Sequence, residues 1–340
     1  MGRRVILDTL DPLIAGLREA GYTVVGPTVR DGVIRYGELD ELPRGWSDEQ
    51  DPGRYRLRRE GELVFGFAAS PDSVKRWTHP PRETLFRWGE PAPEPEAPRV
   101  ALLGVRACDL AALAVQDRVL KSAAYRARRE ALFLVAVNCA VPGGTCFCAS
   151  MGTGPRAESG FDLALTELTG PHRFLVEVGS DRGAAILADL PARAASATDR
   201  EAAQEVSRTA AARMGRSVDL DGVKERLVER RESPVWNEIA SRCLTCGNCT
   251  MVCPTCFCTT VEDGDLERTE RWDSCFTLEF TELGGAPVRS SGAARYRQWL
   301  THKFSTWVDQ FDTYGCVGCG RCITWCPTGI DITEELERLR

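Results

Sequence analysis

The 340-residue chain is poor in the features that most enzyme active sites require. It has only three histidines, so catalysis by a histidine base has little to draw on. No G-x-G-x-x-G follows a predicted strand and no P-loop occurs, so neither dinucleotides nor nucleoside triphosphates have a recognisable phosphate cradle. No Ser/His/Asp set is apparent. We therefore expect no flavin or NAD site and no catalytic residue in this chain.

Features of membrane, secreted and nucleic-acid-binding proteins are also missing. No apolar stretch reaches the roughly 18 residues of a transmembrane helix, and the longest, around residues 131–137, suits a buried strand. The chain turns acidic at Asp8, too early for the apolar core of a signal peptide. A net charge of −6 argues against a nucleic-acid partner. We expect a cytoplasmic protein that binds neither membrane nor nucleic acid.

Cysteine, in contrast, is abundant, with 15 residues. Without signs of secretion, we expect thiolates that bind metal rather than disulfides. Two runs share the spacing C-x2-C-x2-C-x3-C-P, which is typical of bacterial ferredoxins. The first run is Cys243, Cys246, Cys249, Cys253 and Pro254, and the second is Cys316, Cys319, Cys322, Cys326 and Pro327.

Each run places three thiolates on one tight loop, and in two-cluster proteins the fourth cysteine of a run ligates the other cluster. We therefore predict two [4Fe–4S] clusters with exchanged ligands. One takes Cys243, Cys246, Cys249 and Cys326, and the other takes Cys316, Cys319, Cys322 and Cys253. Structural zinc is the alternative, but zinc sites use paired C-x2-C knuckles and need neither the third cysteine nor the Cys-Pro closure.

Four more cysteines follow two predicted parallel strands. Apolar strands at residues 100–105 and 132–137 flank a helix at residues 110–120, which indicates a βαβ unit. Cys108 follows the first strand, and Cys139, Cys146 and Cys148 follow the second. The carboxyl ends of parallel strands lie side by side, so these cysteines could form a third metal site, for which [4Fe–4S] is favoured over zinc. The alternative is that they are small buried hydrophobic residues.

The predicted fold class is α+β, with an N-terminal α/β domain around the parallel βαβ core and a C-terminal α-helical ferredoxin domain with two [4Fe–4S] clusters. Residues 1–89 form a small α+β lobe with a helix at 7–20 and strands at 23–25, 33–36, 55–57 and 63–67. Residues 90–98 are a Pro-rich connector, 99–232 the α/β domain, and 233–340 the ferredoxin domain. The 62 residues between Cys253 and Cys316, with a helical pattern at 294–311, exceed what a compact βαββαβ ferredoxin needs.

Several further residues stay open to two interpretations. Three cysteines are not required as ligands of the two clusters: Cys256, Cys258 and Cys275. They either pack in the interior or complete another metal site. Two basic stretches are expected to be solvated faces: Lys75, Arg76, His79 and Arg82, and then Arg289, Arg295, Arg297, His302 and Lys303. The alternatives are a partner-docking surface for the first stretch and cations that raise a cluster's potential for the second.

The chain resembles the iron–sulfur β subunits of soluble, sulfhydrogenase-type [NiFe] hydrogenases that are linked to NAD(P), and the related electron-input subunit of anaerobic sulfite reductase. The resemblance covers nearly the whole chain, and plain ferredoxins lack several of the motifs that carry it. These are Gly104-Val-Arg-Ala-Cys-Asp-Leu-Ala-Ala-Leu113, Tyr125-x-x-Arg128-Arg129, Cys146-Phe-Cys-Ala-Ser-Met-Gly152, Gly160-Phe-Asp-Leu-Ala-Leu-Thr166, Cys253-Pro-Thr-Cys-Phe-Cys258, Arg271-Trp-Asp-Ser-Cys275, Arg295-Tyr-Arg297 and His302-Lys-Phe304.

The resemblance implies an electron-transfer subunit in a heteromeric complex. Its partners would be a subunit that binds flavin and NAD(P) and the small and large subunits of a [NiFe] hydrogenase. The alternative within the same chemistry is the electron-input subunit of anaerobic sulfite reductase. An alternative of another class is a zinc-stabilised scaffold without a redox role.

Overall fold

A mixed eight-stranded sheet forms the base of the protein. The computed structural model describes residues 3–91, 94 and 97–340. In spatial order the strands are β11 (Arg193–Ala194), β1 (Arg4–Leu7), β10 (Arg173–Val178), β9 (Leu163–Leu168), β8 (Phe133–Val137), β7 (Val100–Val105), β2 (Thr23–Arg30) and β3 (Val33–Glu38). Strands β2, β7, β8 and β9 are parallel, and the outer strands pair antiparallel. The fold is therefore mixed α/β with a parallel core.

Helices cover both faces of this sheet because its central strands are apolar on both sides. Every residue of β7, β8 and β9 is buried, as expected for parallel strands between two layers. On one face the apolar side chains pack with α1 (Asp11–Glu19) and α5 (Asp181–Ala188). On the other they pack with α3 (Ala107–Val119) and α6 (Ala197–Ala212). Helix α4 (Ala123–Ala131) joins α3 to β8.

Locally encoded elements match their predictions, whereas one predicted strand does not form. The β7–α3–β8 unit confirms the predicted βαβ motif. Residues 63–67 are irregular because the N–H groups of Val64 and Phe65 donate to the Glu167 carboxylate, at 2.6 and 2.9 Å, instead of to a neighbouring strand. Strands β1, β2 and β3, from the first 89 residues, belong to the same sheet as β7–β10.

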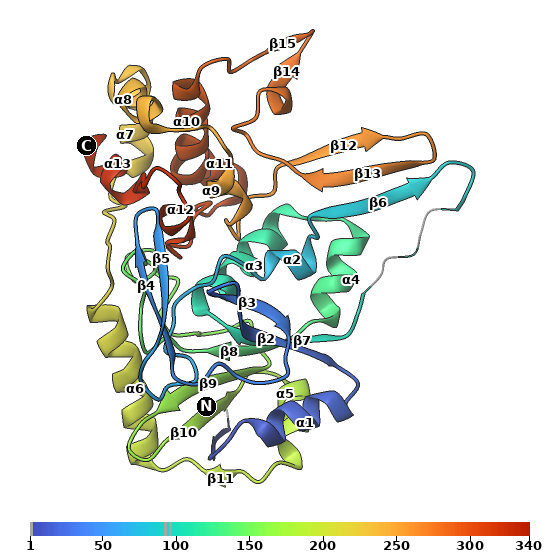
Figure 1. Ribbon diagram of the computed structural model, residues 1–340, viewed down its shortest axis with the longest axis vertical. Helices are drawn as coiled ribbons and strands as arrows, with labels where there is room; N and C mark the ends of the chain where they lie inside the picture. The colour runs from blue at the N-terminus through green and yellow to red at the C-terminus, as the bar shows by residue number, and fades with distance from the viewer. Residues whose placement is uncertain (1–2, 92–93, 95–96) are drawn as a thin grey trace.

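The C-terminal third is built from short helices that pack on their own apolar core. They are α7 (Val223–Glu229), α8 (Val235–Arg242), α9 (Asn248–Met251), α10 (Gly292–Thr301), α11 (Trp307–Phe311), α12 (Arg321–Thr324) and α13 (Ile332–Arg338), with the single turns η1 (Arg230–Glu232), η2 (Glu279–Thr281) and η3 (His302–Thr306). Figure 1 shows these helices stacked above the sheet, with the hairpin of β4 (Trp46–Asp51) and β5 (Arg54–Arg59) between the two layers.

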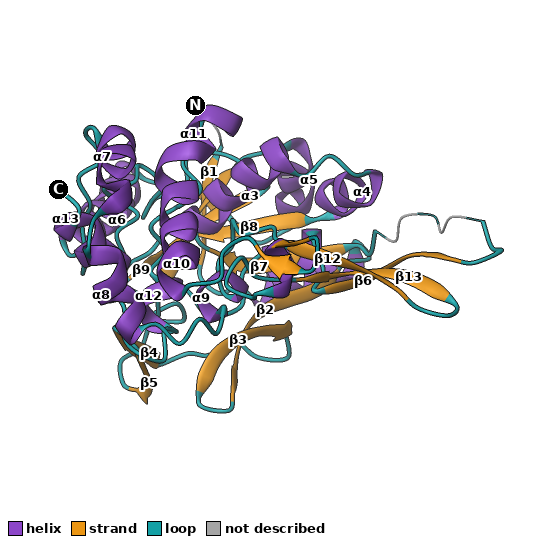
Figure 2. Ribbon diagram, turned by 90° about the horizontal axis from the view of Figure 1, so that it is seen from above, coloured by secondary structure: helices purple, strands orange, loops and turns teal. Residues whose placement is uncertain are grey.

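A three-stranded sheet projects from the side of the molecule, as Figures 1 and 2 both show. It joins β12 (Thr259–Asp263), β13 (Glu267–Trp272) and β6 (Arg82–Arg87), which follows the short helix α2 (Lys75–Thr78). Two further strands of two residues each, β14 (Glu282–Leu283) and β15 (Ala286–Pro287), pair with one another. Of the connector predicted at 90–98, residues 92–93 and 95–96 lie outside the described residues. No helix among the described residues has the length and apolar character needed to cross a membrane.

Candidate metal centres

The first group of cysteines gathers around one cavity between the C-terminal helices. Its members are Cys243, Cys246, Cys249 and Cys326. The rest of the lining is largely apolar and includes Phe276, Tyr296 and Ile330. Burial raises the pKa of Cys249, and the charges of Cys243 and Cys326 raise it further, as expected for thiols that face one another. The structure thus brings together the four cysteines that the exchange of ligands predicts.

The loop that carries three of these cysteines is closed by residues with positive φ. Thr245 has φ 52° and Gly247 has φ 73°. A Cβ on Gly247 would lie 2.8 Å from Oγ of Ser274, so only glycine fits this turn. The N–H of Thr245 donates to Sγ of Cys243 at 3.4 Å, an interaction that favours the thiolate form.

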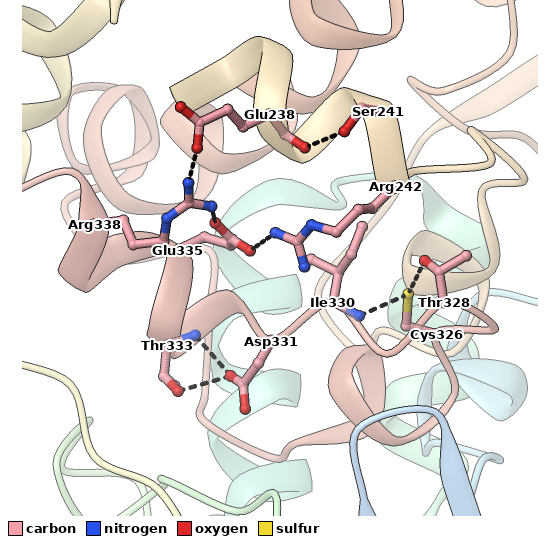
Figure 3. A network of polar contacts seen from close by, with 10 residues as sticks. All are labelled: Glu238, Ser241, Arg242, Cys326, Thr328, Ile330, Asp331, Thr333, Glu335 and Arg338. Atoms are coloured by element: carbon pink, nitrogen blue, oxygen red, sulfur yellow. Dashed lines mark hydrogen bonds and ion pairs between the residues drawn. The ribbon is translucent and has the colours of Figure 1, made fainter. Parts of the chain in front are cut away.

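The fourth cysteine of the first group, Cys326, reaches the cavity from the other end of the sequence. Its Sγ accepts a hydrogen bond from the N–H of Ile330 at 3.3 Å and lies 3.4 Å from Oγ1 of Thr328 (Figure 3). Nearby, the buried carboxylate of Glu335 pairs with Arg242, the residue before Cys243. This ion pair links the two chain segments that supply the group.

The second group joins the second cysteine run to the last cysteine of the first run. Its members are Cys253, Cys316, Cys319 and Cys322. Burial raises the pKa of Cys316, Cys319 and Cys322, and the charge of Cys253 raises each of them further. Cys253 therefore lies near the second run.

A buried lysine contacts this second group. Lys303 is 3% exposed, and its Nζ donates to Sγ of Cys253 at 3.3 Å and to the carbonyl of Gly315 at 2.9 Å. It lies in η3, a π-helical turn, a conformation that often marks functional sites. A cation and hydrogen-bond donor at a ligand sulfur raises the potential of a bound cluster.

The prediction that both basic stretches are solvated faces is wrong for four residues, which are 2–8% exposed: Lys75, His79, Arg295 and Lys303. Sequence reasoning missed the two lysines because their burial depends on thiols that are distant in the chain. Arg76 and Arg82 are exposed, in agreement with the prediction.

The third group lies at the carboxyl ends of β7 and β8. Its members are Cys108, Cys139, Cys146 and Cys148. Burial raises the pKa of Cys146 to about 12, with a further contribution from the charge of Cys139. Cys139 and Cys146 also contribute, after burial, to the raised pKa of Cys148, and Cys148 contributes to that of Cys108. The structure brings together all four cysteines of the possible third site.

The three groups form a contiguous row. The N–H of Phe147 donates to the carbonyl of Gly318 at 2.8 Å, which joins the loop of the third group to that of the second. A Cβ on Gly318 would lie 2.7 Å from the backbone N of Cys148, so glycine is required for this close approach. Cys322 of the second group also lines the cavity of the first.

The spacing of these cysteines is wider than a single ion requires. Among the described residues, no three His, Cys, Asp or Glu side chains stand close enough to share one metal ion. A Zn²⁺ ion binds thiolates at about 2.3 Å and needs such a close set. A [4Fe–4S] cube presents one iron atom to each of four thiolates and therefore suits more widely separated sulfurs.

Comparison with known proteins agrees with this chemistry. Residues 242–330 match the model of a 4Fe-4S dicluster domain. The chain is 30% identical over 324 residues to sulfhydrogenase 2 subunit beta of Pyrococcus furiosus, which covers 90% of this chain and 95% of that protein. The chain belongs to the sulfhydrogenase β-subunit family. No solved structure gives a significant match.

Membership of the sulfhydrogenase β-subunit family confirms the resemblance seen in the sequence motifs. It also identifies the chain as an iron–sulfur protein related to a hydrogenase subunit. The comparisons give no support to the alternative of an anaerobic sulfite reductase subunit.

Proposed function

We propose that this chain relays electrons within a cytoplasmic, multi-subunit [NiFe] hydrogenase complex. The observation that carries the proposal is that Cys326 lines the same cavity as the first three cysteines of the first run. Lys303 likewise joins Cys253 to Gly315, the residue before the second run. Both contacts support an exchange of the fourth ligand between the two runs. The first and second groups would each hold one [4Fe–4S] cluster within an α-helical ferredoxin domain. When bound, such a cluster takes up and releases single electrons.

The third group extends the proposed relay. Cys108, Cys139, Cys146 and Cys148 would hold a third [4Fe–4S] cluster at the edge of the parallel sheet. The contact between Phe147 and Gly318 supports this role, because it sets the third group directly against the second. The row of centres would then run from the C-terminal helices to the sheet.

The partners are inferred from the family and from the chemistry that the sequence lacks. A relay needs a donor and an acceptor, and this chain has no recognisable dinucleotide cradle. A subunit that binds flavin and NAD(P) would exchange electrons at one end, and the small and large [NiFe] hydrogenase subunits at the other. The name of the relative, a sulfhydrogenase subunit, supports such an assembly.

Anaerobic purification of the full chain with its partners tests the proposal. We expect at least about 12 iron atoms per chain, the content of three four-iron clusters, and signals of reduced clusters in EPR spectra after dithionite. A nickel-binding large subunit should co-purify. Fewer than about eight iron atoms per chain, or a colourless protein that contains zinc, would contradict the proposed function.

A further inference from the structure

The three cysteines outside the groups above also lie together in the structure. Cys256 and Cys258 follow Cys253 and lead into the β12–β13 hairpin. At the foot of that hairpin the N–H of Asp273 donates to the carbonyl of Cys258 at 2.8 Å, which brings Cys275 back against Cys258. The β12–β13 register pairs Thr259, which follows Cys258, with Trp272, three residues before Cys275.

This set lies between the first and second groups. Cys256 follows Cys253 of the second group by three residues, and Thr255, the residue before Cys256, lies 3.1 Å from Sγ of Cys253 through its Oγ1. The charge of Cys249, from the first group, acts on Cys275. Cys256 is 9% exposed, and Cys258 and Cys275 are half-buried. Three thiols therefore share one partly enclosed position beside two proposed clusters.

A second buried lysine contacts this set. Lys75 is 2% exposed, donates from Nζ to the carbonyl of Cys256 at 3.1 Å, and lies 3.7 Å from the centre of the Trp272 ring. Among the described residues, no carboxylate forms an ion pair with Lys75 or Lys303. Lys303 donates to the sulfur of Cys253, whereas Lys75 donates to the backbone carbonyl of Cys256.

Two buried ammonium groups without carboxylate partners require other negative charge. Burial of an unpaired charge is unfavourable, so buried charges are normally paired or placed beside a metal site. The second group supplies anionic sulfur for Lys303. Lys75 also requires negative charge close to its ammonium group. The thiols of Cys256, Cys258 and Cys275 are placed to supply this charge as thiolates.

We propose that Cys256, Cys258 and Cys275 hold a further [4Fe–4S] cluster, with Lys75 as the buried cation that offsets its negative charge. Three thiolates would ligate three of the iron atoms, and the fourth iron would take a ligand that is not cysteine. This proposal rests on the iron–sulfur function proposed above. It assigns every cysteine of the chain to a metal centre.

The test compares the wild-type full chain, purified without oxygen, with the triple variant C256S/C258S/C275S. We expect the triple variant to lose about four iron atoms per chain and one EPR signal, while the signals of the two ferredoxin clusters persist. The single variant K75M should lose part of the same iron or shift the midpoint potential of the same signal. R76M is the matched control, because Arg76 is the exposed neighbour of Lys75 and should behave as wild type.

A triple variant with the iron content and all signals of the wild type would overturn the proposal. So would a Cys258–Cys275 disulfide found by peptide mass mapping of the anaerobic wild type. If the triple variant does not fold, K75M decides: unchanged iron content and unchanged potentials would overturn it. A wild type without ferredoxin-cluster signals would instead refute the proposed function itself.

Discussion

At the scale of single residues, the proposed exchange of the fourth cysteine would determine which centre a mutation affects. Cys326 is one residue from Pro327 and four from Cys322, yet its sulfur faces Cys243 and Cys249. A hydrogen bond from the N–H of Ile330 holds it there. Proximity in the sequence therefore does not identify the centre that a cysteine belongs to.

Cys326→Ser should damage the cluster anchored at Cys243, Cys246 and Cys249. A serine hydroxyl is a poorer ligand for iron than a thiolate, so we expect loss or conversion of that cluster alone. EPR spectra of the reduced variant give the measurement, and Cys253→Ser is the reciprocal control. If C326S alters only the centre anchored at Cys316, the assigned exchange is wrong.

Lys303→Met should lower the midpoint potential of the second centre. A hydrogen bond to a charged group contributes roughly 1.5–3 kcal/mol, and about 1.4 kcal/mol corresponds to about 59 mV for a one-electron couple. We therefore expect a decrease of about 60 mV or more in an EPR-monitored redox titration. Lys303→Arg, which keeps the charge, should retain most of the potential. An unchanged potential in K303M would show that the Nζ contact with Cys253 does not tune the cluster.

At the scale of elements, local sequence signals predict the sheet core but not the contacts between distant segments. The apolar runs of β7 and β8 and the helix between them are each recognisable from fewer than 15 consecutive residues. Strand β13 pairs with β6, with Thr269 opposite Thr84, and no local sequence pattern predicts this pairing. The cysteine spacing predicted the first two groups because ligand distance is encoded in the loop itself. The burial of Lys75 and Lys303 depends on tertiary contacts and so escaped prediction.

Helix α6 begins with a capping box, which allows a prediction about its stability. Hydrogen bonds from Ser196, together with Arg173 and Arg193, lower the pKa of Asp199. The carboxylate therefore stabilises the fold above the ordinary carboxyl pKa of about 4, and this contribution is lost as the pH falls through the lowered value. Asp199→Asn should cost about 1–2 kcal/mol of unfolding free energy at pH 7.

Anaerobic thermal unfolding of wild type and D199N at pH 7 and pH 4 measures this effect. The difference between the two proteins should be smaller at pH 4, because wild-type Asp199 then gains less from its charge. Asp189→Asn is the control, since Asp189 follows the end of α5 and caps no helix start. A difference that grows towards acid pH would contradict the assigned role.

At the scale of the whole molecule, a buried ion pair joins the sheet layer to the C-terminal helices. Asp109 on α3 and Arg321 on α12 pair at 2.9 Å, and each side chain is 1% exposed. Arg321 also donates to the carbonyl of Ser70 at 2.6 Å. The two layers are therefore held together by polar contacts beside the second and third groups.

Arg321→Met should destabilise the protein by about 3–5 kcal/mol, because it leaves Asp109 charged and unpaired in the interior. The double variant D109L/R321M should recover part of that loss. Anaerobic denaturant unfolding of both variants and the wild type gives the values. Equal stabilities of the double variant and R321M would show that the unpaired charge is not the cause.

Cys246 is exposed, whereas Cys253 and Cys319 are buried. The row of cysteine groups therefore has one end at the protein surface and a shielded interior. Oxygen and chelators would reach the thiolate at the surface before those behind it. Oxidative damage should therefore begin at the Cys246 end of the chain's metal sites and advance inward, so that a partly inactivated protein keeps its interior centres longest.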